Sequence, residues 1–138
     1  MEIKDIKGFI LPITSSMYQN ISNRNKAVFC KFMPFQRPLK YLKSKQRLFF
    51  YFSGGLIGKS NITSIKMLKP KNILDSYSKE LLISPDEFNF YTEGRLNRKM
   101  LVLFINNISI FKKKIGLVYP VTTSGRYMTK NEYNNMKK

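Results

Sequence analysis

The hydrophobic pattern of the chain predicts short strands joined by short helices. The runs Leu48–Phe52 and Met100–Ile105 are apolar or aromatic at every position, which is typical of strands that are covered on both faces. Alternation in Lys26–Phe32 predicts a strand that places Val28 on one side and Lys31 on the other. The other strands that the pattern predicts are Gly8–Ile13, Leu56–Leu68 and Leu117–Val121.

Two helix starts are marked by capping boxes, in which Ser or Thr is followed three residues later by Glu. These are Ser84–Glu87, which also has Pro at the first helical position, and Thr129–Glu132. Further short helices are expected at residues 14–23 and from Pro70. The prolines within Met33–Lys45 predict an exposed loop.

The elements add up to five or six strands and three or four short helices. Two strands that are apolar on both faces favour a barrel-like sheet over an open one in a chain of 138 residues. The prediction is an α+β fold, a small mixed β pseudo-barrel with short flanking helices. A bulge is expected at Asn106-Asn107 of the long central strand. The length and the lack of a linker predict one domain over residues 1–138.

The charge balance directs attention to polyanions. The chain has 25 Lys and Arg against 8 Asp and Glu, a formal net charge of +17. Such a charge opposes compact folding unless a polyanion offsets it, which favours nucleic acid as the partner. The alternative is a compositional bias toward Lys, Asn and Ile without a binding role.

Several chemistries are excluded or disfavoured. The chain has no His, so it has no imidazole base and no His metal ligand. The single Cys30 cannot form an intramolecular disulfide, and its apolar neighbours favour a core residue. No run of residues matches a membrane span or a signal peptide. We therefore expect a cytoplasmic protein without a metal, a cofactor or a membrane partner.

Several motifs occur in an order that is similar to a known superfamily. They run from about residue 9 to the end of the chain. The segments are Val28–Lys31, Leu48–Tyr51 with the Gly turn that follows, Ile57–Ile62, Ile83–Phe88 with Tyr91, Arg98–Met100 and Pro120–Thr129. The ordered set resembles the PUA-like superfamily, which includes the PUA, ASCH and EVE domains, and is nearest to an uncharacterised archaeal family within it. The resemblance implies a PUA-like pseudo-barrel that binds RNA, and some ASCH proteins are reported to cleave RNA.

One candidate binding segment is a basic stretch interleaved with Phe35 and Tyr41. Its cations can displace the counterions of phosphates, and its rings can stack on bases. The alternative is a solvated loop whose rings pack into the core. The cations are Arg37, Lys40, Lys43, Lys45 and Arg47.

A second candidate is the hydroxyl-rich turn that precedes the last helix. Its amides and hydroxyls could hold a phosphate, with Arg126 as a bidentate clamp and Tyr127 stacked on a base. The alternative is a turn that caps the next helix. The residues are Thr122, Thr123, Ser124, Gly125, Arg126 and Tyr127.

Three single residues complete the set. Lys31 would be a polar anchor beside Phe29 if that side of the strand lines a cleft, or it snorkels to solvent. Tyr51 is either a ligand contact or a buried ring. Arg98, with Arg95 and the run Lys112–Lys114, extends a basic stripe or solvates strand ends.

These features favour a nucleic-acid-binding module over an enzyme, with RNA as a better candidate than DNA. The ligand would include a modified or flipped-out base held by stacking. One alternative is a metal-independent ribonuclease of the ASCH kind, which would use Lys31, Tyr51, Arg126 and Tyr127. Another is a structural basic protein of a ribonucleoprotein assembly.

Overall fold

The computed structural model of the protein describes residues 6–22, 24–32, 46–117, 121–122 and 125–136. Its strands are β1 (Ile6–Pro12), β2 (Lys26–Lys31), β3 (Arg47–Phe52), β4 (Gly55–Leu68), β5 (Met100–Gly116) and β6 (Arg126–Thr129). Its helices are α1 (Ser15–Ile21), α2 (Pro70–Tyr77), α3 (Pro85–Thr92) and α4 (Lys130–Met136).

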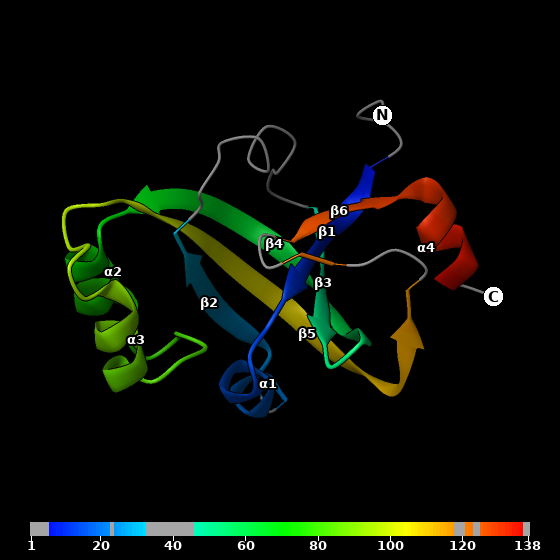
Figure 1. Cartoon of the computed structure of the whole chain (residues 1–138), viewed down its shortest axis with the longest axis horizontal. Coiled ribbons are helices and arrows are strands. Elements are labelled where there is room, and N and C mark those ends of the chain that lie inside the picture. The colour runs from blue at the N-terminus through cyan, green and yellow to red at the C-terminus, as the bar shows by residue number, and fades with distance from the viewer. Residues whose placement is uncertain (1–5, 23, 33–45, 118–120, 123–124, 137–138) are drawn as a thin grey trace.

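The six strands of the described chain form one mixed sheet in the order β2-β5-β4-β3-β1-β6. Strands β1 and β3 are parallel, and all other neighbours are antiparallel. Helices α2 and α3 lie at one end of the sheet, α4 lies at the other, and α1 follows β1 (Figure 1). The predicted α+β pseudo-barrel with short flanking helices is confirmed.

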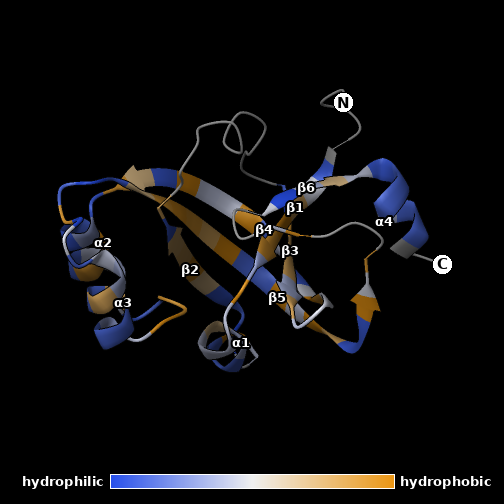
Figure 2. Ribbon diagram, in the orientation of Figure 1, coloured by the Kyte–Doolittle hydropathy of each residue, from blue (hydrophilic) through white to orange (hydrophobic). Residues whose placement is uncertain are grey.

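The central strands bury side chains on both faces, as the sequence predicts. Leu48 and Phe50 of β3 pack in the central core, whereas Phe49 packs in a second cluster near α4. On β5, Leu103 faces the central core and Val102 faces a third cluster beneath α2 and α3. Hydrophobic residues therefore run along these strands, while α4 is mostly hydrophilic (Figure 2).

Local signals set the helix starts and the strand bulge. The Oγ of Ser84 accepts a hydrogen bond from the Glu87 N–H at 3.2 Å, which caps α3. Asn107 has φ +52°, and the pairing of β4 with β5 shifts between Lys59 and Asn61, where β5 carries an extra residue. The predicted cap and the predicted bulge at Asn106-Asn107 are both confirmed.

The last strand differs from the prediction. Leu117 and Val121 are not in a strand, and residues 118–120 lie outside the described part of the chain. The strand is instead Arg126–Thr129, which pairs antiparallel with β1. It has one buried side chain, Met128, so backbone pairing rather than a hydrophobic pattern defines it.

The edge strand β2 is fastened to the segment that carries α3. Val28 forms a parallel bridge with Leu81, and the Phe32 N–H donates to the hydroxyl of Tyr91 at 3.1 Å. These two contacts hold α3 beside β2 and leave a space between them.

No helix of the described residues is long and apolar enough to span a membrane.

Candidate functional site

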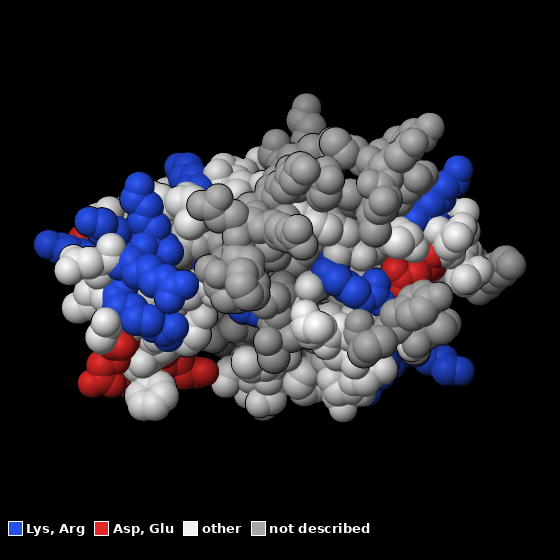
Figure 3. All heavy atoms as spheres, turned by 45° about the horizontal axis from the view of Figure 1, so that its top comes forward, with Lys and Arg blue, Asp and Glu red and all other residues white. Residues whose placement is uncertain are grey.

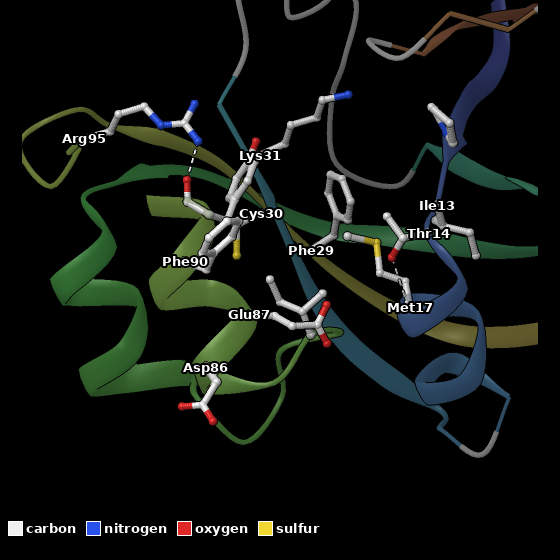
Figure 4. A pocket seen from close by; sticks show the side chains of 13 residues that line it. Ile13, Thr14, Met17, Phe29, Cys30, Lys31, Asp86, Glu87, Phe90 and Arg95 are labelled. Carbon is white, nitrogen blue, oxygen red and sulfur yellow. Dashed lines mark hydrogen bonds between the residues drawn. The ribbon is translucent and has the colours of Figure 1, made fainter. Parts of the chain in front are cut away.

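A cleft of about 790 Å³ opens between the end of β1, the start of α1, the edge strand β2 and helix α3. Figure 4 shows it from close by. Its lining residues are Pro12, Ile13, Thr14, Met17, Phe29, Cys30, Lys31, Ile83, Asp86, Glu87, Phe90, Tyr91 and Arg95.

Aromatic rings form much of the wall of this cleft. Phe29 projects from β2 and is almost fully buried, whereas Phe90 projects from α3 and is 81% exposed. An isolated ring this exposed gains nothing from packing in the free protein, but it offers a flat face for stacking. Met17 and Tyr91 add apolar surface to the same cleft.

One end of the cleft is cationic. The guanidinium carbon of Arg95 lies 4.2 Å from the ring centroid of Phe32 and 4.8 Å from that of Tyr91, and Arg95 donates to the Tyr91 carbonyl. These contacts hold Arg95 in place at the rim. Lys31 lies at the same end (Figure 4), and burial lowers the pKa of its ammonium group from the usual 10.5.

The opposite end of the cleft is acidic. Asp86 and Glu87 occupy the first turn of α3, and both lie away from Lys31 and Arg95 in the close-up view (Figure 4). Both carboxylates are exposed. The cleft is therefore polarised, with hydrogen-bond donors at one end, acceptors at the other and aromatic rings between them.

The cationic end of the cleft continues into a wider basic surface. Figure 3 shows Lys and Arg gathered at the end of the molecule that carries α2 and α3. Arg98 lies 5.3 Å over the ring of Phe32. Leu68 pairs with Met100, so the flanking Lys69 and Lys99 leave neighbouring strands at this same end. We call Lys69, Arg95, Arg98 and Lys99 the basic end.

Cys30 lines the cleft but is not a reactive nucleophile. Its thiol is free, and burial raises its pKa to about 12. The thiol therefore stays protonated at neutral pH, and only the thiolate is strongly nucleophilic.

Among the described residues, no group of His, Cys, Asp and Glu side chains could hold a metal ion.

The structure brings some of the predicted site residues together and separates others. Lys31 lines the cleft and Arg98 lies beside it on Phe32. Tyr51 packs instead in the cluster that contains Phe49, on the other side of the core. Arg37, Lys40, Lys43, Lys45, Thr123 and Ser124 lie outside the described residues.

Arg47 and Tyr127 both contact aromatic side chains of the protein itself. Arg47 donates to the hydroxyl of Tyr133 and lies 5.3 Å over its ring. Tyr127 packs edge-on against Phe9, with ring centroids 5.2 Å apart. Neither residue lines the cleft.

The described part of the hydroxyl-rich turn leads into β6. The Gly125 N–H donates to the Thr122 carbonyl at 2.9 Å, and Gly125 has φ +79°. A side chain at Gly125 would come within 2.6 Å of the Ile10 carbonyl oxygen. Glycine is therefore required here for the close approach of the turn to β1.

Arg126 is held by Glu132 of α4. Two nitrogens of its guanidinium donate to the two carboxylate oxygens, each at 2.7 Å. Burial alone would raise the pKa of Glu132, but hydrogen bonds from Arg126 and Thr129 and the charge of Arg126 outweigh it, so the pKa is lowered. The planar fork of Arg126 thus has an internal carboxylate partner, and its role as a phosphate clamp stays a prediction.

Replacing Arg126 with Lys should lower the free energy of unfolding by roughly 0.5–1 kcal/mol, because one ammonium cannot reproduce the bidentate pair. The lowered pKa of Glu132 means that this stabilisation is present above the ordinary Glu pKa of about 4.3 and is lost as the pH falls through the folded-state value. Chemical denaturation at neutral and acidic pH measures both effects. If Arg126→Lys is as stable as the wild type but binds RNA more weakly, Arg126 contacts the RNA and does not mainly stabilise the fold.

The hydrophobic pattern did not single out Phe90 or Glu87 as site residues. Phe88 and Phe90 lie two apart on a short helix, and only the buried Phe88 belongs to the core. Glu87 reads as the last residue of a capping box, which it also is in part. An aromatic residue placed off the core face of a helix is the one sequence signal that points to Phe90.

Solved structures with a similar fold include three from Zymomonas mobilis. Its ASCH protein matches with a TM-score of 0.78 at 15% identity, over 95% of this chain and 94% of that one. A variant of it with one Tyr replaced by Phe matches with a TM-score of 0.78 at 15% identity, over 95% and 96% of the two chains. A variant with one Ser replaced by Ala matches with a TM-score of 0.79 at 15% identity, over 96% of each chain.

These matches confirm the PUA-like, ASCH-type fold. At 15% identity the likeness concerns the fold alone. No curated protein matches the chain. A match at the sequence level covers residues 6–130, nearly the whole chain, and is to the family described as "Domain of unknown function (DUF365)". The chain therefore belongs to the DUF365 family.

Proposed function

We propose that this protein is a nucleic-acid-binding module that takes an unpaired base into the cleft between β2 and α3. The observation that carries the proposal is an exposed ring, Phe90, that shares one cleft with two cations, Lys31 and Arg95. Rings stack on bases of any sequence, and cations at one end of the stack hold the attached phosphate.

The basic end supplies a path for the rest of the strand. Lys69, Arg98 and Lys99 lie at the same end of the molecule as Arg95, so a strand whose base enters the cleft would pass over them. Release of counterions from the phosphates would supply the sequence-independent part of the affinity. RNA is the preferred partner, because unpaired bases in loops and ends are the usual targets of recognition in RNA.

The free thiol of Cys30 fits the reducing cytoplasm, which we propose as the location.

Fluorescence anisotropy with labelled RNA at several salt concentrations tests this proposal. If the protein covers about five phosphates, the logarithm of the association constant should fall with the logarithm of salt with a slope of about −3.5 for a single strand and about −4.5 for a duplex. The single strand should bind more tightly than the duplex, because only its bases can enter the cleft. Failure to bind either RNA at low salt would refute the proposal.

RNA cleavage is a second candidate function, and the burial of Lys31 favours it. Burial lowers the pKa of the Lys31 ammonium, which makes the neutral amine more available as a general base. The amine would take the proton of a ribose 2′-hydroxyl, whose oxygen attacks the adjacent phosphorus and expels the 5′-oxygen, which takes a proton from water. End-labelled RNA that is shortened by the wild type and not by Lys31→Met would establish this activity. RNA that stays intact with both would exclude it.

A further inference from the structure

The edge of β2 carries one main-chain position that opens into the cleft. In an antiparallel ladder, the N–H and C=O groups of successive residues point alternately toward the neighbouring strand and away from it. β2 is the edge strand and pairs only with β5 in the described sheet. Every second residue of β2 therefore directs both of its main-chain groups away from the sheet.

The hydrogen bonds at the two ends of β2 show which residues these are. The Val28 N–H donates to the Glu80 carbonyl at 2.8 Å, and the Val28 carbonyl accepts from the Leu82 N–H at 3.2 Å. Four residues further along, the Phe32 N–H donates to the Tyr91 hydroxyl. Val28 and Phe32 thus both face away from β5, and by the same alternation so does Cys30, which lies between them.

The outward groups of Cys30 face the cleft without a partner in the described part of the chain. Cys30 lines the cleft, and no hydrogen bond to its N–H or C=O is formed by the residues that the structure describes. Main-chain groups in a largely apolar site are costly to leave without partners. Cys30 therefore presents one donor and one acceptor, side by side, to whatever enters the cleft.

The length of the opening favours a planar ring over an extended peptide. Val28 and Phe32 are about 13 Å apart along the strand, and both are already bonded to the segment that carries α3. An added peptide strand would need several consecutive open positions. A single open position between two closed ones matches the donor and acceptor of one heterocycle.

The polarity of the cleft orients that ring. A nucleotide with its phosphate at Lys31 and Arg95 directs the far edge of its base toward Asp86 and Glu87 (Figure 4). A carboxylate only accepts hydrogen bonds, so it pairs with an exocyclic amino group and opposes a carbonyl oxygen. Cytosine and adenine have such a group next to a ring nitrogen acceptor, whereas uracil has a carbonyl oxygen there.

We propose that the main-chain pair of Cys30 reads the hydrogen-bonding edge of an unpaired amino-bearing base, cytosine or adenine, and that Glu87 accepts a hydrogen bond from its amino group. This inference rests on the proposed function, because it assigns the base that the cleft binds. The Cys30 N–H donates to the ring nitrogen and the Cys30 C=O accepts from the amino group. Phe90 supplies the stacking surface, and the buried Phe29 is part of the apolar wall.

Amide hydrogen exchange measured by NMR tests the main-chain contact. In the free protein the Cys30 amide should exchange faster than those of Phe29 and Lys31, which face β5. A short oligouridylate with one central cytidine should slow exchange at Cys30, and the same oligonucleotide without cytidine should slow it less. Binding of the cytidine probe with no change at Cys30 would overturn the inference and leave the proposed function intact, whereas no binding of either probe would overturn both.

Affinity measurements with matched variants test the part assigned to Glu87. Glu87→Gln should reduce the preference for cytidine over uridine by about tenfold, because the amide presents its own amino group. Glu93→Gln is the control, since Glu93 is an exposed acid at the end of α3 that does not line the cleft. A central pyrimidinone riboside, which lacks only the amino group, should bind more weakly than cytidine and more tightly than uridine. Equal affinity for cytidine and uridine in the wild type would overturn the assignment.

Discussion

Replacing Phe90 with alanine should weaken the binding of single-stranded RNA by roughly 5- to 150-fold, which corresponds to about 1–3 kcal/mol for the loss of one base-stacking ring. Phe90 is 81% exposed, so its removal takes little from the packed core. The melting temperature should therefore stay close to that of the wild type. Parallel anisotropy titrations and thermal melts of the two proteins give both values.

Leu96→Ala provides the matched control for this substitution. Leu96 is also a large exposed apolar residue, 60% exposed, and it follows α3 closely in the chain without lining the cleft. RNA binding should be nearly unchanged in this variant. If both variants bind RNA as tightly as the wild type, Phe90 is not a stacking surface.

Replacing Lys31 with methionine should weaken RNA binding by about tenfold or more, because a charge-assisted hydrogen bond to phosphate contributes about 1.5–3 kcal/mol. The same change should raise the melting temperature. Burial of Lys31 disfavours its charged form and lowers its pKa, so the folded protein binds this proton less firmly than the unfolded chain does. Burial of the charged Lys31 therefore costs stability at neutral pH, and this cost is relieved as the pH rises from the lowered pKa toward the ordinary value of 10.5.

Lys26→Met is the control for the loss of one positive charge from β2. Lys26 is exposed at the opposite end of the same strand and lines a separate, smaller cavity of about 240 Å³. This variant should lose affinity only through the diffuse, salt-dependent contribution. A Lys31→Met protein that is less stable and binds RNA normally would show that Lys31 has a structural role.

Much of the fold could be predicted because its signals are local. Residues that cap a helix, such as Ser84, act within one turn, and the apolar faces of Met100–Ile105 follow from position along the strand alone. β6 was missed because residues 126–129 bury only Met128 and are defined by pairing with β1. Such backbone pairing leaves little trace in the hydrophobic pattern.

The site was harder to predict, because it depends on which faces meet in three dimensions. Alternation correctly set Lys31 apart from Val28, but it cannot tell which face of a strand borders a cleft. Tyr51 lies on the face of β3 that turns toward α4. Phe90 becomes part of a wall only because Tyr91, one residue later, bonds to the end of β2. The internal partner of Arg126 also comes from a different element, α4.

The central claim, that an unpaired base binds between β2 and α3, is tested most directly by an NMR titration of isotope-labelled protein with a short single-stranded RNA. Mapping the shifted backbone amides locates the binding surface in one measurement. The predicted result is that the largest changes occur at Phe29, Cys30, Lys31 and Phe90, with smaller changes at Arg98 and Lys99. Changes confined to the distant lysines Lys112–Lys114, or no changes at low salt, would contradict the claim.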